Sequence, residues 1–182
     1  MRKTAPKRSL RISVALAVLA LALTTVLVTE RTAGSGDVPA SAATTGATEW
    51  VDFTLPDASG RQVSLRQSIG KKPVLLVFWA TWCPQCNESV PVINRMHTEP
   101  PTSETLTILA LDFMESREKV SAFIASKKVA FPVLLDGSGS VAREYRVVGI
   151  PTYVLIDRDG KIVYRDHEIP EIARYLGKPG GR

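Results

Sequence analysis

Two patterns of apolar residues divide the 182-residue chain. Residues 12–29 form an uncharged stretch that is rich in Leu, Val and Ala. As a helix this stretch would extend about 27 Å, which crosses most of a hydrocarbon core of roughly 30 Å. From residue 49 onward, short apolar runs alternate with stretches of helical periodicity. The first pattern predicts a membrane segment, and the second predicts an α/β domain.

The predicted domain begins with a hairpin, because the apolar runs 51–55 and 62–65 flank the turn residues 57–60. A second hairpin is predicted around Asp157-Arg158-Asp159-Gly160. Continuous apolar runs are typical of strands buried on both faces, so parallel strands are expected at the centre of the sheet. Strands are predicted at Val74–Trp79, Leu106–Leu111, Val133–Leu135, Thr152–Ile156 and Lys161–Tyr164. Helices are predicted at 83–97, 116–127, 141–145 and 170–176.

The composition changes between the two patterns. In residues 31–48, 15 of 18 residues are Ala, Gly, Ser, Thr or Pro. Such a segment buries too little apolar surface to offset its ordering entropy, so a flexible linker is predicted. The chain therefore divides into an N-terminal signal anchor at 1–30, a linker at 31–48 and one domain at 49–178, which is long enough for a single core.

The net charge of +5 belongs to the N-terminus alone. Five bases and no acid precede residue 30, whereas the rest of the chain carries 18 bases and 18 acids. A neutral domain without a basic stripe argues against a nucleic-acid partner. Because the five bases precede the apolar segment, they predict a cytoplasmic N-terminus and a domain on the periplasmic or extracellular face of the cell membrane.

A cleaved signal peptide is the alternative to an anchor, and it would end in a small-x-small site. Ala20-Leu21-Ala22 falls inside the apolar run, and Ala40-Ser41-Ala42 comes about a dozen residues too late for such a site. An uncleaved, single-pass anchor is therefore favoured. No cysteine lies near this segment to carry a lipid anchor.

The candidate chemistry lies in Cys83-Pro84-Gln85-Cys86, which contains both cysteines of the chain. At the start of a helix, unpaired backbone N–H groups and the helix dipole favour a Cys83 thiolate, which makes Cys83 the candidate nucleophile. Pro84 suits the first helical position, where its missing N–H would have had no partner. Cys86, one turn later, is expected to be the more enclosed, resolving thiol. The arrangement favours thiol-disulfide exchange.

Three other readings of the cysteine pair are a structural disulfide, half of a zinc site and two buried thiols. Zinc would need about four ligands, yet the chain has no further cysteine, and His97 and His167 lack a ligand spacing. Asn87 stands where a covalent haem site would need histidine. A bridge that closes so small a loop constrains the unfolded chain little, so a redox pair is favoured over all three, with no metal and no cofactor.

Around the cysteine pair the sequence resembles the thioredoxin superfamily, in particular its membrane-anchored, extracytoplasmic TlpA/ResA/DsbE(CcmG)-like branch. The resemblance covers residues 49–176. It implies a three-layer α/β sandwich with a central mixed sheet, an N-terminal hairpin and an extra strand-helix insertion. The motifs that carry it are Phe78-Trp79-Ala80-Thr81-Trp82-Cys83-Pro84-Gln85-Cys86, Gly149-Ile150-Pro151-Thr152 and the extra strand and helix between them.

The resemblance also implies roles for individual residues. It implies a redox-active Cys83–Cys86 disulfide and a cis peptide bond before Pro151, which lies against that disulfide. The exposed backbone beside Pro151, at Ile150, is implied to pair with a substrate in an extended conformation. From the residues alone, a trans turn proline is the more common case. The other residues expected around the pair are Trp82, Pro84 and Gln85.

The chain departs from the family pattern at two positions near the cysteines. Val77 stands where thioredoxins carry a buried Asp, and Ser89 stands where many relatives in this branch have Glu. Glu88 is the neighbouring carboxylate, but positions i and i+2 do not share a helix face with Cys86. Glu115 is a second weak candidate for aiding proton transfer. The proton acceptor for Cys86 is left open between these carboxylates and water.

Two tryptophans flank the predicted active-site loop. Trp79 ends a buried strand and is expected to belong to the core. Trp82 directly precedes the nucleophile and is expected to be an exposed contact surface.

These residues predict a thiol-disulfide oxidoreductase in which Cys83 attacks a partner disulfide and Cys86 resolves the mixed disulfide. The resemblance implies a reductase that keeps apocytochrome c thiols, or those of similar protein clients, reduced. Its electrons would come from a membrane thiol-disulfide transporter. The alternatives are a disulfide-forming oxidase and a Cu(I)-binding or thiol-chaperone protein. The copper alternative is weak, because no Met or His stands near the pair.

Overall fold

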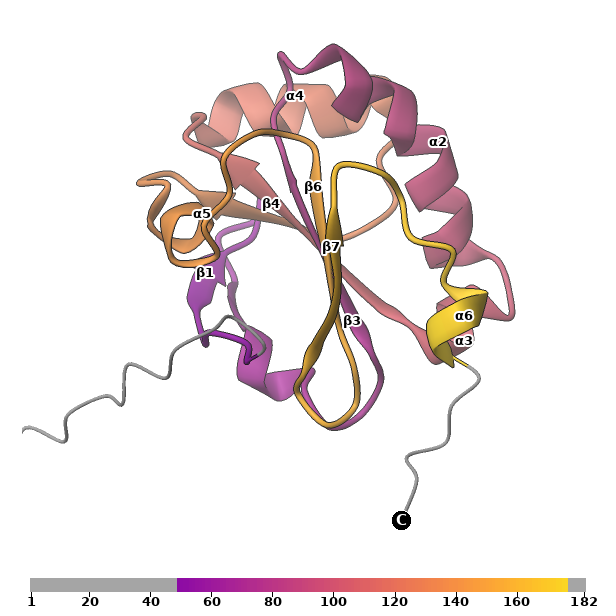
Figure 1. Cartoon of the computed structure of the whole chain (residues 1–182). Helices are drawn as coiled ribbons and strands as arrows, with labels where there is room; N and C mark the ends of the chain where they lie inside the picture. Colours follow the sequence, from indigo (N-terminus) through magenta and orange to yellow (C-terminus); the bar gives the residue numbers. More distant parts are fainter. Residues whose placement is uncertain (1–48, 177–182) are drawn as a thin grey trace, which may run out of the picture. The chain divides into compact units, whose positions relative to one another are not determined.

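The computed structural model describes residues 49–176, and its centre is a five-stranded sheet with the order β5-β4-β3-β6-β7 (Figure 1). β3 pairs parallel with β4, and β4 pairs parallel with β5. β6 pairs antiparallel with both β3 and β7, so the sheet is mixed, as the resemblance implies. The strands are β3 (Val74–Trp79), β4 (Thr107–Phe113), β5 (Val133–Asp136), β6 (Thr152–Ile156) and β7 (Ile162–Asp166).

The two faces of the sheet carry separate apolar cores, because successive strand residues point to opposite faces. Leu75, Val77 and Trp79 of β3 pack with buried residues of α2 and α4. Leu76 and Phe78 pack on the other face, with buried residues of α5 and the N-terminal segment. Figure 1 shows α2 and α4 on one side of the sheet and α5 with β1 on the other. The helices are α2 (Pro84–Thr98), α3 (Thr102–Thr105), α4 (Arg117–Lys127), α5 (Ser140–Glu144) and α6 (Ala173–Leu176).

The predicted entry hairpin is present, with shorter strands than the sequence suggests. β1 (Thr54–Pro56) pairs antiparallel with β2 (Gln62–Ser64), and a 3₁₀ helix, η1 (Leu65–Gln67), follows. The segment before β1 does not pair as a strand. The N–H and the carbonyl of Val51 both bond instead to the hydroxyl of Tyr145, the residue that caps the C-terminus of α5.

Three further differences separate the observed elements from the predicted ones. α3 was not expected after the break at Pro100 and Pro101, but the Leu106 N–H donates to the Thr102 carbonyl and closes one helical turn. α6 starts at Ala173 rather than at Pro170. β4 continues beyond Leu111 through a buried aspartate, because strands pair with it on both sides up to that point.

The remaining sequence predictions fall on other parts of the chain. The predicted anchor at 1–30, the linker at 31–48 and residues 177–178 of the predicted domain lie outside the described residues. Across residues 49–176, none of the helices combines the length and the apolar character that a membrane crossing requires.

Tyr145, the C-terminal cap of α5, joins the N-terminal segment to the core. Its side chain is buried and packs against Phe78 and Phe53, with ring centroids 5.5 and 6.4 Å away. Its hydroxyl donates to the Val51 carbonyl at 2.8 Å and accepts from the Val51 N–H at 3.1 Å. One side chain therefore satisfies both backbone groups of a residue that no strand holds.

We expect Tyr145→Phe to lower the free energy of unfolding by about 1–3 kcal/mol, because it leaves backbone groups unpaired at a partly buried site. Urea denaturation monitored by circular dichroism would measure this loss. Tyr164→Phe is the matched control, since the Tyr164 hydroxyl donates to the Glu168 carbonyl at an exposed position. An equal loss of unfolding free energy in the two variants would contradict the prediction that the Tyr145 hydroxyl stabilises the fold more than an exposed hydroxyl does.

Candidate active site

The two cysteines lie where β3 passes into α2, and they form a disulfide with a Cα–Cα distance of 5.2 Å. Cys83 is the N-cap of α2, and its sulfur accepts from the Cys86 N–H at 3.2 Å. Pro84 occupies the start of the helix, where it removes no hydrogen bond. The sulfur of Cys83 thus sits among the free N–H groups that stabilise negative charge at a helix N-terminus.

Both cysteines are almost fully buried in this disulfide form, so the expectation of a more enclosed Cys86 thiol stays a prediction. Cys83 is 4% exposed and Cys86 is 3% exposed. Cys83 is covered because the Ile150 carbonyl oxygen lies 3.7 Å from its sulfur. The two tryptophans lie as predicted: Trp79 is buried, whereas Trp82 is 59% exposed beside the disulfide.

The loop before β6 forms the second wall of the site. The Ile150–Pro151 peptide bond is cis, and Pro151 and Cys86 line the same small cavity. His167, which follows β7, reaches this loop with Nδ1 2.7 Å from the Pro151 carbonyl oxygen. Sequence analysis considered His167 only as a possible zinc ligand. Nothing in the sequence around His167 indicates a contact with Pro151, which lies 16 positions earlier.

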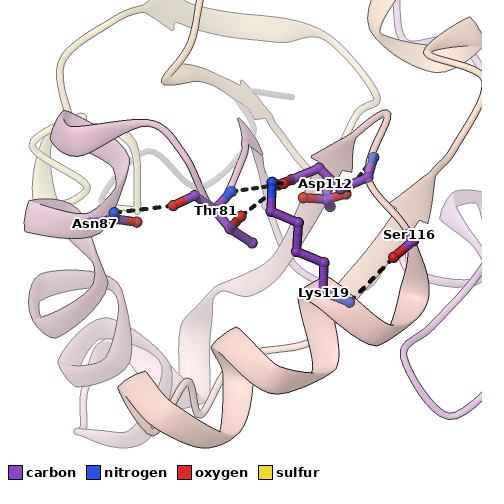
Figure 2. A network of polar contacts seen from close by, with 6 residues as sticks. Thr81, Asn87, Asp112, Ser116 and Lys119 are labelled. Atoms are coloured by element: carbon purple, nitrogen blue, oxygen red, sulfur yellow. Dashed lines mark hydrogen bonds and ion pairs between the residues drawn. The ribbon is translucent and has the colours of Figure 1, made fainter.

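A polar network holds the loop that leads to Cys83 (Figure 2). The Glu115 carboxylate accepts from the Thr81 N–H at 2.6 Å and from its hydroxyl at 2.8 Å. Asn87 donates to the Thr81 carbonyl at 3.2 Å, so every polar group of Thr81 is held. Lys119 forms an ion pair with Glu115. Glu115 is therefore engaged with the loop two residues before Cys83, whereas Glu88 is exposed on α2.

Asp112 is a buried carboxyl group that the sequence prediction missed. It lies at the end of β4, in register with Trp79, and is 0% exposed. Its Oδ1 accepts from the Glu115 N–H at 3.3 Å, and its Oδ2 has no hydrogen-bond partner within residues 49–176. Burial, together with the neighbouring Glu115, raises the pKa of Asp112 to about 8. An acid directly after the apolar run Leu106–Leu111 was the available signal.

Glu115 takes the opposite charge state. Burial opposes its ionisation, but hydrogen bonds from Lys119 and Thr81 outweigh burial and lower the pKa of Glu115. At neutral pH the pair therefore holds one proton, on Asp112, and one negative charge, on Glu115. That charge is partnered by Lys119 and by the backbone of the active-site loop.

A pair of hydroxyl groups, those of Ser89 and Tyr153, lies beside Cys86. Tyr153 donates to Ser89 at 2.9 Å, and Ser89 donates to the Gln85 carbonyl at 2.9 Å. Burial raises the pKa of Tyr153, so its hydroxyl stays protonated at neutral pH. Ser89 and Tyr153 line a cavity of about 10 Å³ together with Cys86 and Val77. Tyr153 was not singled out from the sequence, because it is 64 residues from Ser89.

Taken together, the site contains a buried disulfide at a helix N-terminus, a proline loop against it and a loop before Cys83 that side chains hold in place. Such an arrangement supports exchange between the Cys83–Cys86 disulfide and an external thiol or disulfide.

Comparison with known proteins agrees with this chemistry. The model of the AhpC/TSA family matches residues 47–165. The chain is 35% identical over 131 residues to the thiol-disulfide oxidoreductase ResA of Bacillus thuringiensis subsp. konkukian, covering 70% of this chain and 74% of that protein. It is 36% identical over 114 residues to the thioredoxin-like protein YneN of Bacillus subtilis, covering 61% of this chain and 65% of that one.

A similar structure supports the same fold. A Chlorobium tepidum protein assigned as the thiol:disulfide interchange protein DsbE superposes with a TM-score of 0.62 at 30% identity. The match covers 70% of this chain and 89% of that protein. The thioredoxin-like fold is thus shown both by the strand order and by this superposition.

The proton on Asp112 predicts a pH-dependent stability. The folded protein holds this proton up to about pH 8, whereas an unfolded chain releases it near pH 4. Stability should therefore fall as the pH rises from 6 to 8, by about 1–3 kcal/mol. Over this range Glu115 is ionised in both states and adds no slope. Asp112→Asn should flatten the curve, which urea denaturation at several pH values would measure. Asp159→Asn, an exposed control, should retain the wild-type slope; a wild-type slope in Asp112→Asn would refute the protonation assignment.

Proposed function

The chain belongs to the AhpC/TSA family and is a ResA-like thiol-disulfide oxidoreductase, and on this basis we propose that it reduces the disulfides of protein clients outside the cytoplasm. The observation that carries the proposal is the Cys83–Cys86 disulfide at the N-cap of α2, with the Ile150 carbonyl 3.7 Å from the Cys83 sulfur. This observation supports the proposal, because a helix N-terminus stabilises a Cys83 thiolate and the Ile150 backbone lies beside it.

In the proposed reaction the reduced enzyme begins with a Cys83 thiolate. This thiolate attacks one sulfur of the client disulfide, a mixed disulfide forms, and the other client sulfur leaves as a thiolate that takes a proton from water. The Cys86 thiol then loses its proton to solvent and attacks the Cys83 sulfur. The Cys83–Cys86 bond forms, the bond to the client breaks, and the second client sulfur leaves as a thiolate and is protonated. The client gains two electrons, and the enzyme is left oxidised.

We assign the surrounding residues to client contact. Trp82 offers an exposed aromatic surface next to the disulfide. Pro84 and Gln85 are exposed on the first turn of α2. Ile150 is half-buried and offers its backbone beside Pro151 to an extended client segment. In this proposal the client disulfide approaches between this loop and the start of α2.

The reducing direction follows from the proposed location. A domain at 49–178, linked by residues 31–48 to a membrane anchor at 1–30, would stay close to a membrane thiol-disulfide transporter that supplies electrons. A general oxidant of free clients has less need of such a tether. Apocytochrome c, whose thiols must be reduced for haem attachment, is the client class that we favour.

We expect Cys86→Ser to accumulate mixed disulfides with client proteins, because Cys83 can still attack but nothing resolves the product. Non-reducing gels of the full chain, followed by mass spectrometry after thiol release, would detect the adducts. Cys83→Ser is the control and should trap nothing at position 83. Absence of any adduct in Cys86→Ser, with the protein shown to be folded, would argue against protein clients.

The reduction potential of the Cys83–Cys86 pair tests the direction separately. Equilibration with glutathione buffers should place it closer to the value of about −270 mV found for thioredoxin than to the value of about −120 mV found for a strong oxidant. A potential near the second value would replace the reductase assignment with that of a disulfide-forming oxidase.

A further inference from the structure

Two side chains hold the ends of the proline loop beside the disulfide. Thr152 Oγ1 donates to the Gly149 carbonyl at 2.6 Å. His167 Nδ1 lies 2.7 Å from the Pro151 carbonyl oxygen. The His167 ring also lies along the loop, since a Cβ built on Gly149 would be 3.5 Å from ring carbon Cε1. The carbonyl oxygens of Gly149 and Pro151 therefore each have a side-chain hydrogen-bond partner.

The middle carbonyl of this loop has a different partner. The Ile150 oxygen faces the Cys83 sulfur at 3.7 Å, a weak contact compared with the bonds on either side. A client that displaces this contact would find the Ile150 backbone already oriented by its two neighbours. The direction of that backbone then depends on the groups that hold Gly149 and Pro151.

The chemistry of the contact specifies the proton position on His167. A carbonyl oxygen only accepts hydrogen bonds, so Nδ1 must carry the hydrogen. Thr152 Oγ1 lies 3.5 Å from the same nitrogen. The hydroxyl hydrogen of Thr152 is directed to Gly149, which leaves an oxygen lone pair free to face Nδ1–H. His167, Thr152 and the loop thus form one connected set with a consistent direction of donation.

The backbone ladder does not hold the Pro151 carbonyl from this side. The register of β6 with β7 begins at the pair Tyr153 and Asp166 and runs away from the loop. The His167 N–H, the next donor along the chain, is directed to its neighbour Asp166 Oδ1 at 2.6 Å. The imidazole therefore supplies the hydrogen bond that a continued ladder would have supplied.

From these contacts we infer that His167 is a positioning residue for client recognition: it holds the Pro151 carbonyl and so sets the direction in which Ile150 presents its backbone. The inference rests on the proposed exchange with protein clients. His167 does not touch the sulfurs, and its effect falls on the affinity for an extended client more than on the exchange chemistry.

The first test compares His167→Ala with His167→Asn, because the Asn side-chain N–H₂ reproduces the donor at Nδ1. With insulin as the protein disulfide, His167→Ala should raise KM about threefold to tenfold, the effect of losing one hydrogen bond. The kcat for insulin should change less than the KM. With glutathione disulfide, which offers no long extended segment, the kcat/KM should fall less than it does with insulin. His167→Asn should restore most of the affinity. His97→Ala is the matched control, since His97 is the only other histidine of the chain and lies near the far end of α2.

The second test observes the imidazole itself. Nitrogen-15 spectra of the ring, assigned with the His97→Ala variant, should show neutral His167 as the Nδ1–H tautomer. An Nε2–H tautomer would overturn the inference. So would an unchanged KM in His167→Ala, or a loss that His167→Asn does not restore.

The two proposals fail in different ways. If the wild-type protein reduces no protein disulfide, the proposed function fails, and the tautomer still reports whether His167 holds the loop. If the wild-type protein is active and His167→Ala matches it, only the positioning role of His167 is lost.

Discussion

The pairing of β3 on both of its edges is the constraint on which the site depends. Parallel pairing with β4 brings Asp112 and Glu115 to the same end of the sheet as Trp79 and the cysteine loop. Antiparallel pairing with β6 brings the start of β6, and therefore the loop 149–151, to that same end. Three chain segments that are far apart in sequence meet at the disulfide because one buried strand lies between two neighbours. Loss of register on either edge would separate them.

The charges around this site follow from burial. Two carboxyl groups face one ammonium group at the end of β4, and a site that excludes water does not accept two adjacent negative charges. Asp112 remains protonated, and Glu115 keeps its charge because Lys119 and the Thr81 N–H partner it. The ionised carboxylate, Glu115, is thus the one that accepts hydrogen bonds from the active-site loop, and the neutral carboxyl group, Asp112, is the one buried in β4.

The loops around the disulfide are held by side chains rather than by strand ladders. Glu115 and Asn87 fix Thr81, and His167 and Thr152 fix the carbonyls on either side of Ile150. Side-chain hydrogen bonds hold such segments in one conformation while leaving the backbone near the sulfurs accessible to a client. The hydroxyl pair of Ser89 and Tyr153 lines the same small cavity as Cys86.

The sequence by itself determined the features whose signals are local. The apolar run Val74–Trp79 is a strand over those same residues, and Cys83 and Pro84 begin a helix because capping and proline preferences act within one turn. Only the tertiary structure decided which polar groups meet. Glu115 reaches Thr81 across 34 positions, and His167 reaches Pro151 across 16. Sequence periodicity records the face on which a residue lies, whereas the partner on that face is chosen by the register and crossing of strands, which no local pattern specifies.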